Sequence, residues 1–202
     1  ANVPKKTEYT IVGESLFMTA FTNTGQGKKR VSFAAPYTGK IIAFDLQQLG
    51  GKIIAQKDAF LCAAKGVSIG IEFQKRLGTG IFGGEGFIME KLEGDGLAFA
   101  HAGGYVLERE LKAGEILKVD TGCVVAYTAG VDFDIEFIRG IKNWMFGGEG
   151  LFFAKLQGPG KVWLQSLPIS RLAGRIMQYG SYKRKEEGSI LGGLGNLLDG
   201  RE

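Results

Sequence analysis

Short hydrophobic runs, separated by glycine or other turn-forming residues, make up most of this sequence. The alternation is most regular over residues 130–137, where apolar and acidic side chains take turns. The apolar positions are Val131, Phe133, Ile135 and Phe137, and the acidic positions are Asp132, Asp134 and Glu136. A period of two is typical of a strand with one buried face, and a one-residue slip would bury three carboxylates. We therefore predict a strand here with a fixed register.

Similar runs elsewhere predict further short strands and a single helix. The expected strands lie at residues 9–12, 40–44, 52–55, 67–73, 105–111, 116–119, 123–127 and 162–167. Pro168 ends the last of them, because proline has no N–H to donate to a β-ladder. Residues 170–178 place Leu172 and Ile176 on one face of a short helix. Many short strands with glycine-rich turns predict an all-β sandwich with one short C-terminal helix.

One glycine-rich motif occurs twice, 64 residues apart. The first copy is Phe82, Gly83, Gly84, Glu85 and Gly86, and the second is Phe146, Gly147, Gly148, Glu149 and Gly150. At this offset nine of the 21 aligned pairs over residues 82–102 are identical, which indicates an internal repeat. Weaker similarity around residues 14–33 suggests a third, diverged copy. The predicted organisation is a lead at 1–13, repeats at 14–77, 78–141 and 142–180 (the last partial, with the helix), and a charged, glycine-rich tail at 181–202.

Composition narrows the class of protein further. The 33 glycines among 202 residues are about twice the usual share of roughly 7%, which fits many tight turns. The net charge of +4 is too small to imply nucleic acid by itself. Cys62 and Cys123 lie in apolar runs, so we expect buried thiols in a reducing compartment rather than a disulfide. No apolar run approaches the roughly 18 residues of a membrane helix, and the N-terminus does not resemble a signal peptide.

The motifs together resemble one known family. They are the two Phe-Gly-Gly-Glu-Gly segments, the run from 158 to 168, and the segments at 14–17, 21–23 and 34–41. In this combination the sequence is similar to the altered-inheritance-of-mitochondria family over roughly residues 14–175. The resemblance implies a fold like the trp RNA-binding attenuation protein, a tandem-repeat β-sandwich or short double-stranded β-helix. It also implies ring-like trimeric assembly, no enzymatic activity to carry over, and a longer segment before the 14–17 motif.

The repeated motif is better explained by structure than by ligand binding. Its glycines permit positive φ and a close approach of the backbone at a bend. Residues 78–83 also match the pattern GxGxxG, but no strand–turn–helix context follows, so we do not expect a dinucleotide site. Glu85 and Glu149 supply one carboxylate each, whereas Ca²⁺ takes about six to eight oxygens. We therefore predict no cofactor and no metal.

No residue pattern selects a catalytic site. His101 is the only histidine, and a lone histidine at a strand end is more often a surface or hydrogen-bonded residue than a catalyst. The acidic row at Asp132, Asp134 and Glu136 is more simply a solvated sheet face. We therefore expect no enzymatic activity.

Two functions remain. The first is a homo-oligomeric scaffold or interaction protein, with the tail as a contact for a further protein or a membrane surface. The alternative is a ring that binds a ligand or single-stranded RNA, with Lys28, Lys29 and Arg30 as the RNA or anion contacts. Nucleic acid is the less favoured partner, because Lys/Arg and aromatic residues are not densely interleaved. The expected compartment is the cytoplasm, or the mitochondrion if the source is a eukaryote.

Overall fold

The structure is a computed structural model that describes residues 19–75, 86–138 and 151–179. Twelve strands and one helix occupy most of these residues, which confirms the predicted all-β class. The helix spans residues 169–179 and begins directly after Pro168, close to the expected range. The predicted strand at 9–12 and the repeat boundaries at 77/78 and 141/142 lie outside the described residues.

The strands form two successive sets with the same order of elements. The first set is β1 (Gly39–Asp45), β2 (Lys52–Gln56), the 3-10 turn η1 (Lys57–Ala59), β3 (Phe60–Ala63), β4 (Ser68–Lys75), β5 (Phe87–Glu93) and β6 (Leu97–Gly103). The second set is β7 (Val106–Leu111), β8 (Ile116–Asp120), the 3-10 turn η2 (Thr121–Cys123), β9 (Val124–Thr128), β10 (Asp132–Ile138), β11 (Leu151–Gln157) and β12 (Gly160–Gln165). We call these sets the first and second halves of the chain.

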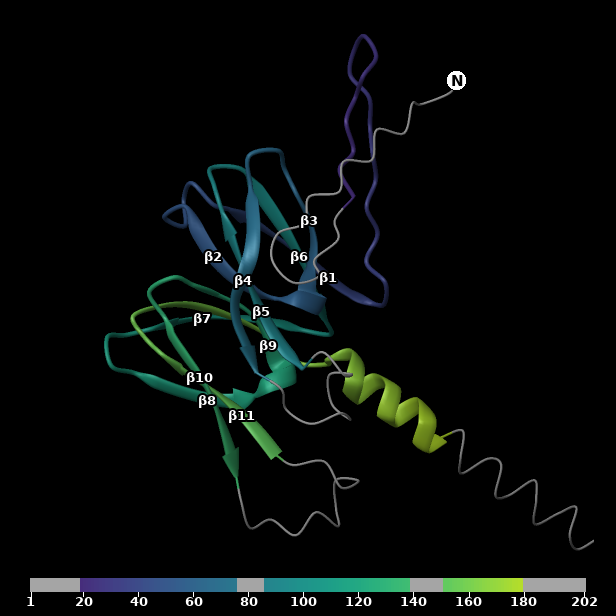
Figure 1. The fold of residues 1–202 in the computed structure, drawn as a ribbon. Helices are drawn as coiled ribbons and strands as arrows, with labels where there is room; N and C mark the ends of the chain where they lie inside the picture. Colours follow the sequence, from purple (N-terminus) through teal and green to yellow (C-terminus); the bar gives the residue numbers. More distant parts are fainter. Residues whose placement is uncertain (1–18, 76–85, 139–150, 180–202) are drawn as a thin grey trace, which may run out of the picture.

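Three sheets are stacked to make the sandwich (Figure 1). A central sheet of six strands has the order β4-β5-β2-β9-β12-β7, so each half contributes three neighbouring strands. The order β1-β6-β3 forms an outer sheet from the first half, and β10-β11-β8 forms the other from the second half. All strand pairs are antiparallel.

The two faces of the central sheet bury two separate hydrophobic clusters. Alternate residues of one strand belong to different clusters, because successive side chains point to opposite faces. In β12, Trp163 packs with Phe44 and the β6 alanines, whereas Val162 and Leu164 pack with Ile135 and Leu156 of the other outer sheet. The central sheet is therefore covered on both sides, which explains the continuous apolar runs in its strands.

The strand at 130–137 matches its prediction in register. Val131 and Ile135 are buried in the second cluster and Phe133 packs against it, whereas Asp132 and Asp134 are exposed. Glu136 on the polar face forms an ion pair with Lys118 of β8. The acidic row therefore lies on a solvated sheet face, as its alternation with apolar residues predicts.

Candidate functional site

The two halves are joined by one strand pair, β2 with β9. Ile53, Ile54 and Ala55 face Thr128, Tyr127 and Ala126, respectively, in an antiparallel register. Both strands are almost wholly buried, with Ile53, Ala55 and Ala126 at 0% exposure. We call this pairing and the side chains around it the internal junction. It shows how one half of this fold recognises another.

Aromatic contacts reinforce the internal junction on one face of the central sheet. Phe133 of the second half stacks on Phe87 of the first half, with ring centroids 5.9 Å apart. It also meets Phe73 edge-on at 5.1 Å and stacks on Tyr127 at 5.3 Å. Such aromatic pairs add about 0.5–1.5 kcal/mol beyond the burial of their area.

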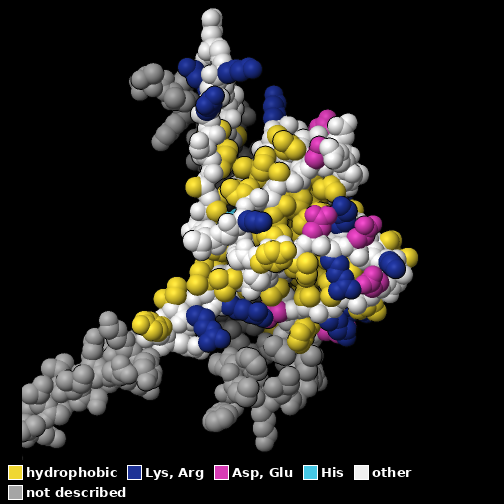
Figure 2. All heavy atoms as spheres, turned by 180° about the vertical axis from the view of Figure 1, so that it is seen from behind, with side chains coloured by type: hydrophobic (Ala, Val, Ile, Leu, Met, Phe, Trp, Pro, Cys, Tyr) yellow, Lys and Arg dark blue, Asp and Glu magenta, His cyan; other side chains and the backbone are white. Residues whose placement is uncertain are grey.

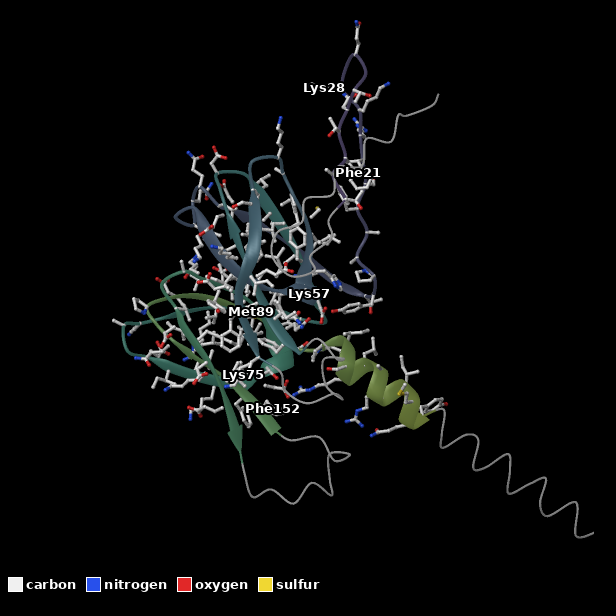
Figure 3. The ribbon with its side chains drawn as sticks, in the orientation of Figure 1. Phe21, Lys28, Lys57, Lys75, Met89 and Phe152 are labelled. Atoms are coloured by element: carbon white, nitrogen blue, oxygen red, sulfur yellow. The ribbon has the colours of Figure 1, made fainter. Side chains whose placement is uncertain are left out.

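Polar contacts cross the junction as well. Gln165 accepts a hydrogen bond of 2.8 Å from the Gly103 N–H of the other half, and its Nε2 donates one of 2.8 Å to the Gly122 carbonyl. Lys75 Nζ donates a hydrogen bond of 2.8 Å to the Ile135 carbonyl across the halves. Figure 3 shows Lys75 between the upper and lower groups of strands. The Gly103–Gln165 and Lys75–Ile135 hydrogen bonds join the halves, and the bond to Gly122 holds the Gln165 amide in place within the second half.

The strands that correspond to this junction have no such partner in the described chain. β3 of the first half corresponds to β9, and β8 of the second half corresponds to β2. Within the described ranges β3 pairs only with β6, and β8 pairs only with β11. All four β3 residues are half-buried, and Ile116 of β8 is 50% exposed. An unpaired strand edge with apolar side chains is a site for pairing with another chain.

Further apolar side chains are exposed on two projecting segments. In the N-terminal segment Phe21 is 65% and Phe33 41% exposed, and their rings meet edge-on with centroids 5.6 Å apart. The C-terminal helix exposes Ile176, Met177 and Tyr179. Figure 2 shows that hydrophobic side chains also cover much of the face seen from behind, with charged side chains mainly at its edges.

Most of the residues predicted for the glycine-rich motif fall outside the described part. Residues 82–85 and 146–150 are not described. Gly86, the last residue of the first copy, has φ of 81°, a conformation that favours glycine. The structural role of the motif therefore remains a prediction for its other residues.

The predicted basic cluster lies on the N-terminal segment, away from the sandwich. Lys28, Lys29 and Arg30 are all exposed, and Figure 3 shows Lys28 near the tip of this segment. Two exposed aromatic residues, Phe21 and Phe33, belong to the same N-terminal segment.

His101 is not a surface residue, because its side chain is only 2% exposed. Tyr37 packs edge-on against the imidazole at 4.3 Å, and a Cβ at Gly39 would come within 2.5 Å of Nε2. Burial lowers the pKa of His101, and an interaction with the backbone of Tyr37 partly opposes this shift, so the neutral imidazole is favoured. The position of His101 at a strand end did not indicate this degree of burial.

Glu90 is a buried acid that the sequence reasoning missed. It lies on β5 with 1% exposure, and its Oε2 atom has no hydrogen-bond partner. Burial raises the pKa of Glu90 to about 7, a shift that Lys57 partly opposes and Asp58 reinforces. The aligned residue of the second half, Ala154, is fully buried and apolar. This repeat comparison is the signal that could have shown a carboxyl group at a core position.

The two thiols, which the sequence predicted to be buried, are buried only in part. Cys62 and Cys123 are both free, in agreement with the absence of a disulfide, but each is only half-buried. Cys62 lies on β3, where the open strand edge leaves one side uncovered. Burial raises the pKa of both thiols, so neither is activated as a thiolate.

The described residues contain no group of three or more His, Cys, Asp or Glu side chains arranged to hold a metal ion. The helix at 169–179 is too short to cross a bilayer, and the described ranges have no other candidate span.

Comparison with known proteins places the chain in a family. The model of the family described as "Mitochondrial biogenesis AIM24" matches residues 5–167. An uncharacterized protein of Streptococcus pyogenes serotype M6 is 30% identical over 171 residues, which are 84% of this chain and 66% of that protein. The crystal structure of another Streptococcus pyogenes protein is similar with a TM-score of 0.60 and 26% identity, covering 72% of this chain and 62% of that one. The chain therefore spans somewhat less than two thirds of both relatives, and it belongs to the mitochondrial biogenesis AIM24 family.

Proposed function

We propose that this protein is a non-enzymatic, homo-oligomeric scaffold whose copies join through their open strand edges. One observation carries the proposal: β3 and β8 are half-exposed and each has one edge without a partner strand among the described residues, whereas the corresponding strands β9 and β2 are buried against each other. The partner in this proposal is a second copy of the chain, because β2 and β9 already make the equivalent contact within one chain.

The burial of side chains on β3 and β8 supports a partner strand more strongly than does the position of these strands at the edges of their sheets. The strand β2 has four buried residues of five, and its counterpart β8 has none. Val125 at the internal junction is 0% exposed, whereas its aligned residue Leu61 on β3 is half-buried. Removing apolar surface from water stabilises an assembly by roughly 25 cal/mol per Å² before the entropic cost of association is counted. The protein acts as a scaffold in this proposal because its repeated order of strands provides contact surfaces.

A substitution on β3 tests the proposal. Leu61→Lys places a charge where the partner would cover the side chain, so the oligomer should dissociate into folded monomers. The matched control is Leu107→Lys on β7, where the side chain is 47% exposed and lies outside the corresponding strands. Light scattering gives the mass, and circular dichroism shows whether each variant remains folded. Equal masses for Leu61→Lys and wild type, both oligomeric, would remove β3 from the interface.

The alternative function is a ring that binds single-stranded RNA, and the exposed basic cluster favours it. Lys28, Lys29 and Arg30 are exposed on the same segment as two exposed rings, and cations and stacking surfaces together are what proteins use to bind single strands. Binding that weakens steeply with salt, and that is lost on changing all three residues to Ala, would support this function. No binding at low salt would exclude it.

The compartment and the further partners belong to the same proposal. Two free cysteines are typical of a reducing compartment, so we place the protein in the cytoplasm. The helix at 169–179 exposes an apolar face and leads into the tail, which makes this end the proposed contact for another protein or a membrane surface.

A further inference from the structure

We infer that β8 of one copy pairs with β3 of the next in one particular register, which sets Val119 opposite Cys62 of the neighbouring copy. This inference rests on the proposed function and adds the partner strand, the residue pairs and the direction of assembly. It is drawn from the internal junction, whose register is known for three residue pairs.

The register is obtained by applying the repeat offset to the residue pairs of the internal junction. The repeat offset of 64 residues converts β2 into β8 and β9 into β3. The pair Ala55 with Ala126 then becomes Val119 with Cys62, and the pair Ile54 with Tyr127 becomes Lys118 with Ala63. Each new pair joins one residue from each of two copies.

The two open edges do not satisfy each other within one chain. β3 belongs to the outer sheet on one face of the central sheet, and β8 belongs to the outer sheet on the opposite face. If a twofold rotation related the two halves, β3 and β8 of one chain would pair as β2 and β9 do. They are not neighbours in any sheet of the described residues. The contact must therefore run head to tail between copies, with one edge of each type used per copy. Head-to-tail contacts close into rings when the rotation permits.

The side chains at the two edges fit this arrangement. Leu117 and Val119 pack partly against the second hydrophobic cluster, and Phe60 and Ala63 pack partly against the first. Each edge is thus the rim of a core that ends without a covering strand in the described chain. Pairing the rims would extend both cores, as the internal junction does where Ile53 and Ile54 join opposite clusters.

Directed disulfide formation tests the register on the full chain. Residues directly opposite in an antiparallel pair have Cα atoms about 4.5–5.5 Å apart, which lies within the range for a disulfide. The test variant is Val119→Cys with Cys123→Ser, so that Cys62 is the only native thiol. Dithiodipyridine serves as the oxidant: it takes up the two electrons and two protons released when the sulfur atoms of residues 62 and 119 join. The matched control is Lys118→Cys in the same background, because its side chain points to the other face of the strand.

We expect Val119→Cys to form a ladder of covalent oligomers on a non-reducing gel. The yield of these oligomers should be at least tenfold higher than for Lys118→Cys. An oligomer by light scattering without this preference would overturn the register and leave the scaffold proposal standing. A monomer at all concentrations, with no covalent product, would remove both.

A second pair protects the test against a variant that does not fold. Lys118 is exposed, so Lys118→Cys is tolerated, and its predicted partner is Ala63. The variant with Lys118→Cys, Ala63→Cys, Cys62→Ser and Cys123→Ser should form the same ladder. If the protein is oligomeric and neither this pair nor the first forms it, the inferred contact is wrong.

Discussion

The ring of Phe44 meets the ring of Trp163 edge-on, with centroids 5.0 Å apart, and this contact ties the first half of the chain to the second. Phe44 is 1% exposed and Trp163 is 5% exposed. The indole nitrogen donates a hydrogen bond of 3.0 Å to Glu108, so the ring is fixed at both ends. Both halves therefore contribute to the same hydrophobic cluster and should not unfold separately.

We predict that Phe44→Ala lowers the free energy of unfolding by about 3–5 kcal/mol, the usual range for removing a buried aromatic side chain. The loss should appear in a single urea transition, because both halves depend on the contact. The control is Met177→Ala, a change at a residue with 72% exposure, which should shift stability by less than about 0.5 kcal/mol. Two separate transitions in wild type would show that the halves are independent.

Removing the Gln165 side chain should weaken the junction through its hydrogen bonds. Gln165→Ala leaves the Gly103 N–H and the Gly122 carbonyl without their side-chain partner. An unsatisfied buried group costs about 1–3 kcal/mol, so we expect a loss of that size in urea unfolding. A change below about 0.5 kcal/mol would mean that water replaces the amide.

Glu90 should make stability depend on pH. Its folded pKa of about 7 lies above the ordinary value of 4.5, so the folded state binds the proton more tightly than the unfolded state. The contribution is fully present below pH 4.5 and is lost as the pH rises through about 7. The variant Glu90→Gln should lack this decline, as thermal unfolding of both proteins between pH 4.5 and 8 will show. Parallel curves for the two proteins would contradict the assignment.

His101 should act in the opposite direction. Its folded pKa is lowered below the ordinary 6.5, so its contribution is present above pH 6.5 and is lost as the pH falls below that value. His101→Leu should remove this acid-side loss, and at pH 8 it should cost no more than the interaction with the Tyr37 backbone, about 0.5–1.5 kcal/mol. A large loss of stability at pH 8 would indicate a contact that the ring makes and leucine cannot.

The sequence alone predicted the elements that depend on local features, namely the alternation of apolar and polar residues and the position of proline. The register of residues 132–136 and the helix after Pro168 followed from side-chain period and proline chemistry alone. The burial of His101 and Glu90 did not, because it depends on sheets that stack from distant parts of the chain. The open edges at β3 and β8 were equally hidden, since they become visible only when strand partners are known.

In our proposal, copies of this chain assemble through the strand edges that match the internal junction. The most direct test is the solution mass by size exclusion with light scattering, for the full chain and for the chain without residues 181–202. We expect the same number of copies in both, with 21.8 kDa per copy for the full chain and a correspondingly smaller mass per copy for the shortened one. Three copies is the number that the family resemblance implies. A mass of one copy at all concentrations, or an oligomer that is lost with the tail, would refute the proposal.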